Sequence, residues 1–283
     1  MSSLGFSLSY KILNIQMTSP ESARCEYWST AREPWPSLLF ILPFLVVYEV
    51  GAILHSQIPA SRNGADLWIR QLGLETGFGL EWLFPLLAPM LLMLWQLCGR
   101  RPWKWSVETL SGMFAESLMF AMLLVMIGQL TALAFPVQQS ALSLTLNSLP
   151  HLSTGNIPRV VSFLGAGIYE EMLFRLTILP ISFVALRAML VPPRVAMVGS
   201  VFISSWLFAT AHYVNSAALF APSELSLAMS TVLDRPELWF SYTFRFFAGV
   251  LFSVIFWVRG FGIAVGCHIL YDLFVGVVLS GIG

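Results

Sequence analysis

Apolar residues gather in seven long runs along this chain, and each run is long enough to cross a lipid bilayer. A spanning helix needs about 20 predominantly apolar residues. The seven runs cover residues 37–55, 79–98, 112–134, 159–183, 195–215, 238–258 and 260–281. Short polar or proline-containing segments separate them, among them GRRPWKW at 99–105 and VPPR at 191–194. The pattern predicts an all-α fold, a polytopic transmembrane helix bundle with about seven spans.

Two segments do not fit this simple pattern. Residues 136–157 are too polar to cross a bilayer, so we expect a loop or a helix on the membrane surface, with an eighth span as the alternative. The run from Arg194 to Ala221 is too long for one straight span, so we expect its last turns to bend or break. These segments decide how often the second half of the chain crosses the membrane.

Composition supports a membrane protein and excludes one class of partner. Of the 283 residues, 57% are hydrophobic and 11% are charged, whereas about a quarter of a soluble domain is charged. The formal net charge is zero and no basic patch is visible, so nucleic acid is not expected as a partner. We expect a polar N-terminal tail over 1–35, without the apolar core of a signal peptide, and a transmembrane domain over 36–283.

Positive charge in the short loops predicts the orientation in the membrane. If the tail and every second loop lie on one side, that side carries nine basic residues and the other side four. The nine are Lys11, Arg24, Arg32, Arg100, Arg101, Lys104, Arg187, Arg194 and Arg259. The four are Arg62, Arg70, Arg159 and Arg235. The larger count predicts a cytoplasmic N-terminus.

Away from the ends of the apolar runs lie nine Asp, Glu, Arg and His side chains, and each charge there costs about 2.5–3.5 kcal/mol on insertion scales. They are Glu49, Glu116, Glu170, Glu171, Arg175, His212, Arg245, His268 and Asp272. Such groups persist where they pair or face a polar cavity. We expect Glu49, Glu116 and Arg245 to be clamps between helices. Arg245 could instead be the countercharge of Asp272 or Glu171.

Four of these side chains, on three different helices, fall at a similar depth in the membrane. At 1.5 Å per residue, Glu170 lies roughly 16 Å past Arg159, and His212 lies roughly 15 Å before Pro222. His268 lies roughly 13 Å from the opposite face, with Asp272 one turn further. Because the hydrocarbon core is about 30 Å thick, these groups share one central layer.

Helical spacing indicates which of them face each other. Glu171 and Arg175 are four residues apart, so they share a face and can form an ion pair. Glu170 points about 100° away and remains as the free carboxylate. His268 and Asp272 are also four residues apart and share a face.

This set of residues suits the activation of water. A carboxylate in an apolar site can take a proton from water and pass it to a leaving amine, as general base and then general acid. One histidine can orient the water, and a second histidine beside a carboxylate can donate to a developing oxyanion. Those are the groups needed to hydrolyse a peptide bond. The same residues could instead hold zinc, with Glu170, His212 and His268 as ligands, although no HExxH motif is present.

Three motifs in this order resemble those of the CPBP family of intramembrane proteases, which includes the type II C-a-a-X prenyl endopeptidases and bacteriocin-processing relatives. The first, EExxxR, is YEEMLFR here and contains Glu170, Glu171 and Arg175. The second, FxxxH, is FATAH and contains Phe208 and His212. The third, Hxxx(N/D), is HILYD and contains His268 and Asp272. The resemblance covers roughly 157–283, which we expect to be the catalytic core.

The resemblance implies a glutamate-dependent endopeptidase that acts on a protein or peptide in or at the membrane. It implies that Glu170 is the general base, that His212 shares the water, and that His268 and Asp272 face the oxyanion. Glu171, Arg175 and Phe208 would support them. No cofactor is expected, with zinc as the alternative because the family was long described as metal-dependent. Two departures from the family's pattern are Leu176 for a common glycine and Asp272 for a common asparagine.

Two other functions use similar residues. Buried acids and histidines also form the proton relays of ion-coupled transporters, although no inverted repeat is visible here. A catalytically idle relative that acts in binding or immunity is the second alternative.

Overall fold

The computed structural model describes residues 26–57, 62–75, 81–135, 157–214 and 221–278. Within these ranges every regular element is a helix and no strand occurs. The predicted all-α helical bundle is therefore confirmed. The polar segment predicted at 136–157 lies almost wholly outside the described residues.

The helices coincide with the predicted apolar runs. In the described part of the chain, four are long and apolar enough to span a membrane: α2 (Pro34–Leu54), α5 (Val107–Ala134), α9 (Pro193–Ala211), and η6 (Pro236–Leu238) with α11 (Trp239–Arg259). Shorter apolar stretches are η2 (Glu81–Leu86) with α4 (Leu87–Cys98), and α12 (Phe261–Leu273) with η7 (Phe274–Val278). The predicted run 159–183 lies in a continuous rod formed by α7 (Ile157–Gly165), η4 (Ala166–Glu170), η5 (Met172–Ile178) and α8 (Leu179–Ala188). These elements make the protein an integral membrane protein.

The structure adds two helices that the apolar runs did not predict, and it ends one run early. The added helices, α3 (Gly64–Glu75) and α10 (Pro222–Asp234), have 12 and 13 residues and are too short to register as spans. The predicted break in the run after Arg194 is confirmed, because α9 stops at Ala211. The depth predicted for His212 was measured along a helix that continued to Pro222. That premise was wrong, because α9 ends at Ala211.

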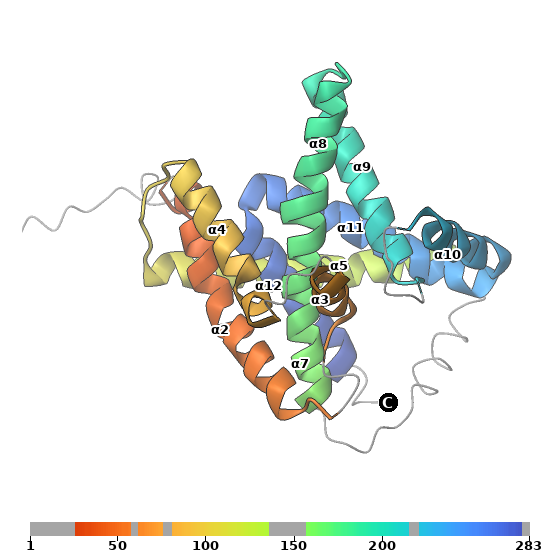
Figure 1. Ribbon diagram of the computed structural model, residues 1–283, viewed down its shortest axis with the longest axis horizontal. Coiled ribbons are helices and arrows are strands. Elements are labelled where there is room, and N and C mark those ends of the chain that lie inside the picture. The colour runs from red at the N-terminus through yellow and green to blue at the C-terminus, as the bar shows by residue number, and fades with distance from the viewer. Residues whose placement is uncertain (1–25, 58–61, 76–80, 136–156, 215–220, 279–283) are drawn as a thin grey trace, which may run out of the picture.

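Helix α12 forms the centre of the bundle. Every residue from Phe261 to Ile269 is buried, and the helix packs against α5, α11 and α2. In Figure 1 the green α7–α8 rod runs through the molecule, with α2 beside its lower half and α9 beside its upper half. The two helices that carry the predicted acids and the HxxxD pair therefore meet in the core.

One glycine allows this meeting. A Cβ added to Gly167 in η4 would lie 2.4 Å from the Ile269 side chain and 3.1 Å from the Ile269 backbone nitrogen. Small residues permit such close approach between membrane helices. The turn that precedes Glu170 consequently lies directly against the α12 backbone next to His268.

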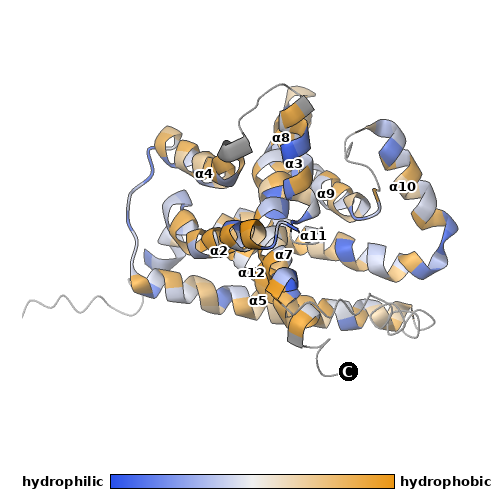
Figure 2. Cartoon of the chain, turned by 60° about the horizontal axis from the view of Figure 1, so that its bottom comes forward, coloured by the Kyte–Doolittle hydropathy of each residue, from blue (hydrophilic) through white to orange (hydrophobic). Residues whose placement is uncertain are grey.

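Large apolar side chains cover much of the outer surface, as expected for helices that face lipid. Exposed examples from three different spans are Val50, Met126 and Phe202. Hydrophobic residues dominate α4 and α5 in Figure 2. A soluble monomer rarely exposes such extensive apolar surface, because that surface favours association.

Glu116 is the structural clamp that the sequence predicted. Both of its carboxylate oxygens accept hydrogen bonds from Arg259, at 2.7 and 2.8 Å, which ties α5 to the end of α11. The Arg259 guanidinium lies 3.6 Å from the centre of the Trp28 ring. Burial, helped by the Glu116 charge, raises the pKa of Tyr27 to about 12, so this neighbouring phenol stays neutral. The clamp is thus a bidentate ion pair whose guanidinium packs against the Trp28 ring.

The joint between α11 and α12 depends on Gly260. Its φ angle is +92°, and an added Cβ would lie 2.8 Å from the Arg32 Cα and 2.9 Å from the Arg32 carbonyl oxygen. We expect Gly260→Ala to lower the free energy of unfolding by about 1–3 kcal/mol, because alanine is strained at this φ and the backbone must shift. Thermal unfolding in detergent micelles measures the loss.

Gly64 is the matched control for this substitution. A Cβ on Gly64 would meet no atom within 4 Å, and its φ is not positive. We therefore expect Gly64→Ala to leave the melting temperature unchanged or slightly raised. Equal melting temperatures for Gly260→Ala and the wild type would contradict the role assigned to Gly260.

Candidate active site

Wide helical turns present the two adjacent glutamates. Glu170 ends η4 and Glu171 precedes η5, and both segments are π-helical, with i to i+5 hydrogen bonding. Such turns are rare and occur often at functional sites. The two side chains end in different environments: Glu171 is fully buried, whereas the Glu170 side chain is 12% exposed.

Glu171 forms the ion pair that its spacing predicted. Its Oε2 lies 3.1 Å from the Arg175 Nε, and both side chains are fully buried. Arg175 also donates to the Gly249 carbonyl oxygen at 3.1 Å. Its guanidinium lies 4.6 Å from the centre of the Phe208 ring and 5.2 Å from that of Phe252. Two ring faces therefore add cation–π attraction to the ion pair.

The second oxygen of Glu171 orients His268. The His268 Nδ1 lies 2.8 Å from Glu171 Oε1, and because a carboxylate only accepts hydrogen bonds, Nδ1 is the donor. The imidazole also stacks on Phe252, with ring centres 4.6 Å apart and planes 12° apart. Its Nε2 then points away, to within 3.5 Å of Asp272 Oδ2 and 3.9 Å of Glu170 Oε2.

His212 is oriented by the end of its own helix. It caps α9, where Tyr213 N bonds to Thr210 O in a tightened last turn. The His212 Nδ1 lies 2.8 Å from the Phe208 carbonyl oxygen, which can only accept, so Nδ1 is the donor. A neutral His212 consequently carries its lone pair on Nε2, which lies 3.8 Å from Glu170 Oε2.

Glu170, His212 and His268 therefore converge on one point. The Glu170 Oε2 is buried and forms no hydrogen bond with any described residue. The 3.8 and 3.9 Å gaps to the two imidazoles are too long for direct hydrogen bonds. A single water molecule about 2.8 Å from each group spans such gaps. The chain thus brings together the three side chains that the sequence placed at one depth, with Asp272 beside His268.

One contact of this cluster was missed from the sequence. Asn63 donates from Nδ2 to Glu170 Oε1 at 3.0 Å. Its Oδ1 accepts from the Ala65 backbone nitrogen at 2.8 Å, which caps α3. The local signal for this cap was available, because asparagine is a preferred N-cap residue and NGAD opens a short helix. No local pattern shows that the cap faces Glu170.

The remaining intramembrane charges are structural. Glu49 accepts from the Tyr169 hydroxyl at 2.5 Å and lies 3.5 Å from an Arg70 nitrogen, so it is a clamp as predicted. Arg245 donates to the Ser241 side chain and, at 3.2 Å, to the Tyr213 hydroxyl. These hydrogen bonds tie α11 to the segment that follows the end of α9, as expected of a clamp, and none of those described goes to Asp272 or Glu171.

The cluster does not have the geometry of a metal site. No group of three or more His, Cys, Asp or Glu side chains among the described residues is arranged to hold a metal ion. Ligands about 2.0–2.1 Å from a tetrahedral zinc ion lie about 3.3 Å apart. The separations of 3.8 and 3.9 Å here are larger, so Glu170, His212 and His268 would need to close in to bind zinc.

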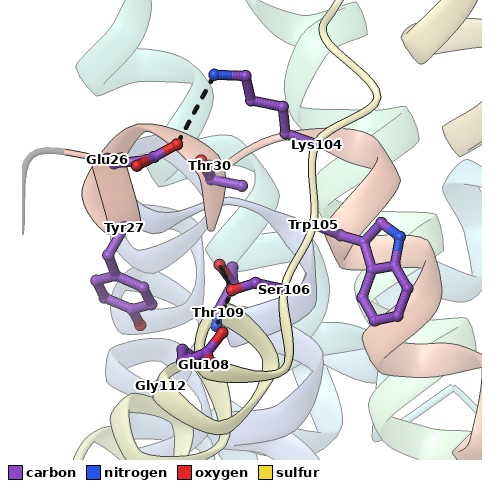
Figure 3. Close-up of a pocket in the computed structure, with 9 residues that line it drawn as sticks. All are labelled: Glu26, Tyr27, Thr30, Lys104, Trp105, Ser106, Glu108, Thr109 and Gly112. Atoms are coloured by element: carbon purple, nitrogen blue, oxygen red, sulfur yellow. Dashed lines mark hydrogen bonds and ion pairs between the residues drawn. The ribbon is translucent and has the colours of Figure 1, made fainter. Parts of the chain in front are cut away.

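A separate pocket of about 450 Å³ lies at the start of α5 (Figure 3). Its lining includes Glu26, Glu108 and Lys104 but no member of the acid–histidine cluster. The Glu26–Lys104 pair, 3.7 Å apart, is largely exposed, and such surface pairs contribute little. This pocket offers no catalytic group comparable to the cluster.

Fold and site together define a class: a helical membrane protein with a buried carboxylate that faces two oriented imidazoles. The comparison with known families agrees with this class. Residues 154–274 match the model of the family described as type II CAAX prenyl endopeptidase Rce1-like, a family of membrane proteases. The resemblance inferred from the three motifs is confirmed. No curated protein and no solved structure matches the chain.

Proposed function

We propose that this protein is an intramembrane endopeptidase that hydrolyses a peptide bond of a membrane-associated or lipid-modified protein or peptide. The observation that carries the proposal is the buried Glu170 Oε2 between two imidazole Nε2 atoms at 3.8 and 3.9 Å. The Rce1-like domain supports a CAAX-type protease at the level of the family. The substrate and the roles of individual residues are part of the proposal.

Glu170 acts as the general base in this mechanism. A water between Glu170 and His212 donates one proton to Glu170 Oε2 while the lone pair on His212 Nε2 orients it. The resulting hydroxide attacks the peptide carbonyl carbon. Glu170 then passes its proton to the leaving amine, which breaks the C–N bond and regenerates the carboxylate.

His268 stabilises the oxyanion. Its Nδ1–H is held by Glu171, whose charge is balanced by Arg175. A protonated Nε2 can therefore be aimed at the carbonyl oxygen as negative charge develops there. Asp272, 3.5 Å from Nε2, favours the protonated imidazole. Phe208 and Phe252 contact the rings of His212 and His268, and in this mechanism they shield the rear of the site from water.

The experiment that tests the function is a comparison of membrane proteomes from cells with the wild-type protein and with Glu170→Ala. We expect an uncleaved precursor to accumulate in the variant. The identity of this precursor distinguishes among the candidate substrates, which are a prenylated C-a-a-X tail, a bacteriocin or leader peptide, and a protein sorting tail. Identical proteomes, combined with proton flux in liposomes that disappears on the substitution, would instead support transport.

Metal dependence is tested separately. We expect the purified protein to retain full cleavage activity after exhaustive dialysis against EDTA, because the proposed base needs no Lewis acid. Elemental analysis of the dialysed protein is the required control. Activity that falls with metal content and returns on addition of zinc would establish the zinc alternative, with Glu170, His212 and His268 as ligands.

We also place the N-terminus on the cytoplasmic side, because the tail and alternate loops carry the larger share of basic residues. Cys98 is exposed and adjoins the basic segment Arg100–Arg101. Its protection from a membrane-impermeant maleimide in intact cells tests this orientation.

A further inference from the structure

We propose that Asn63 is a positioning residue for Glu170 and that residues outside the Rce1-like domain complete the active site. The inference rests on the proposed function, because it assigns to Asn63 the orientation of the catalytic carboxylate. Asn63 lies between α2 and α3, far before the matched residues 154–274.

The hydrogen bond from Asn63 fixes the rotation of the Glu170 carboxylate, so that one of its oxygens faces the histidines. The terminal torsion of a glutamate is broad, so the carboxylate can rotate when nothing holds it. Asn63 Nδ2 donates a hydrogen bond to Glu170 Oε1 at 3.0 Å. The other oxygen, Oε2, then faces the Nε2 atoms of His212 and His268. Without this contact the carboxylate would be free to rotate, and the oxygen beside the histidines would turn away from the shared water.

The amide of Asn63 is itself oriented. Its Oδ1 accepts from the Ala65 backbone nitrogen at 2.8 Å, so the NH₂ group is left to face Glu170. Its backbone nitrogen donates to the Tyr48 hydroxyl at 3.3 Å. Capping the helix and presenting a donor to the carboxylate are thus coupled in one side chain.

The start of α3 is anchored independently of Glu170. Asp66 is fully buried and accepts from the Tyr48 hydroxyl at 2.8 Å. It also pairs with Arg62 and Arg70, each at 2.7 Å. This network fixes the cap residue against the core, so a substitution at Asn63 can remove the contact to Glu170 without releasing the helix.

A second link reaches the same turn from outside the matched domain. The Tyr169 hydroxyl, on the residue before Glu170, donates to Glu49 in α2. The π-helical turn that carries Glu170 is therefore held from both α2 and α3. Neither contact partner belongs to residues 154–274.

Asn63→Ser separates the two roles of this side chain. Serine is as good an N-cap residue as asparagine, but its hydroxyl is too short to reach Glu170. We expect kcat to fall about 10- to 100-fold, because small misplacements of a catalytic group have effects of this size, while KM stays within about twofold. The melting temperature should be unchanged. Turnover is measured with purified, reconstituted protein on the precursor that accumulates in Glu170→Ala membranes.

Asn63→Asp is the second variant. Aspartate is isosteric, also caps a helix, and places a like charge against Glu170, so we expect a larger fall in kcat. Ser106→Ala is the matched control, because Ser106 caps α5 away from the cluster. It should lower the melting temperature without changing kcat or KM.

Wild-type kcat in Asn63→Ser would overturn the inference. If that variant does not fold, wild-type kcat in Asn63→Asp would overturn it instead. Loss of turnover in both variants with an unchanged KM supports it. Glu170→Gln in the same assay keeps the two proposals apart: an active Glu170→Gln refutes the function, whereas an inactive Glu170→Gln with a fully active Asn63→Ser refutes only the positioning role.

Discussion

Replacing Glu170 with glutamine is expected to lower kcat by about 10³- to 10⁴-fold, the upper range for loss of general acid–base catalysis. Glutamine has the same shape and can still accept from Asn63, so the site keeps its geometry. It cannot take a proton from water or deliver one to the leaving amine. The measurement is single-turnover cleavage by the reconstituted protein.

Two comparisons sharpen this result. His212→Ala should reduce kcat less, by about 10²-fold, because it removes the orientation of the water but leaves the base. Glu108→Gln is the matched control. Glu108 is exposed at the start of α5, so its replacement should leave kcat unchanged. Full cleavage by Glu170→Gln would remove the proposed mechanism. Cleavage that is unchanged in His212→Ala would remove the assigned role of that imidazole.

The second large effect is expected at Arg175. Replacing it with methionine removes the arginine charge beside the fully buried Glu171, which then keeps only its hydrogen bond with His268. Breaking a buried pair in this way typically costs about 3–5 kcal/mol. We expect Arg175→Met to lower the melting temperature strongly in detergent micelles and to reduce the yield of folded protein.

A double substitution separates stability from catalysis. In Arg175→Met/Glu171→Met no lone charge is buried, so we expect much of the lost stability to return. His268 nevertheless loses the acceptor of its Nδ1–H, and kcat should stay low. If the single variant Arg175→Met has the melting temperature of the wild type, the Glu171–Arg175 ion pair does not contribute to stability as we expect.

Local geometry explains what could be predicted in advance. Glu171 and Arg175 are four residues apart on one helix, and so are His268 and Asp272, so their contacts follow from helical spacing alone. The apolar runs predicted the spanning helices because a bilayer demands long apolar segments. The ordered motifs indicated the family, and the match at 154–274 confirmed it.

Short helices and the ends of helices were harder to predict. α3 carries charged residues and lacks the length of a span, so its existence depends on Asp66 being satisfied by Tyr48, Arg62 and Arg70. The end of α9 at Ala211 also changes the reasoning about depth, although His212 still reaches Glu170.

By itself, the sequence determined the membrane class, the buried Glu171–Arg175 pair and the set of residues able to activate water. These properties depend on composition and on spacing within single helices. Only the tertiary structure decided that Glu170 Oε2 faces both imidazoles and that Asn63 holds Oε1. Asn63 and Glu170 are 107 residues apart in the chain, and such a contact exists only because α3 packs on the π-helical turn. Packing between distant elements is not encoded in any local pattern, since each helix alone satisfies its own backbone and leaves its side-chain partners open.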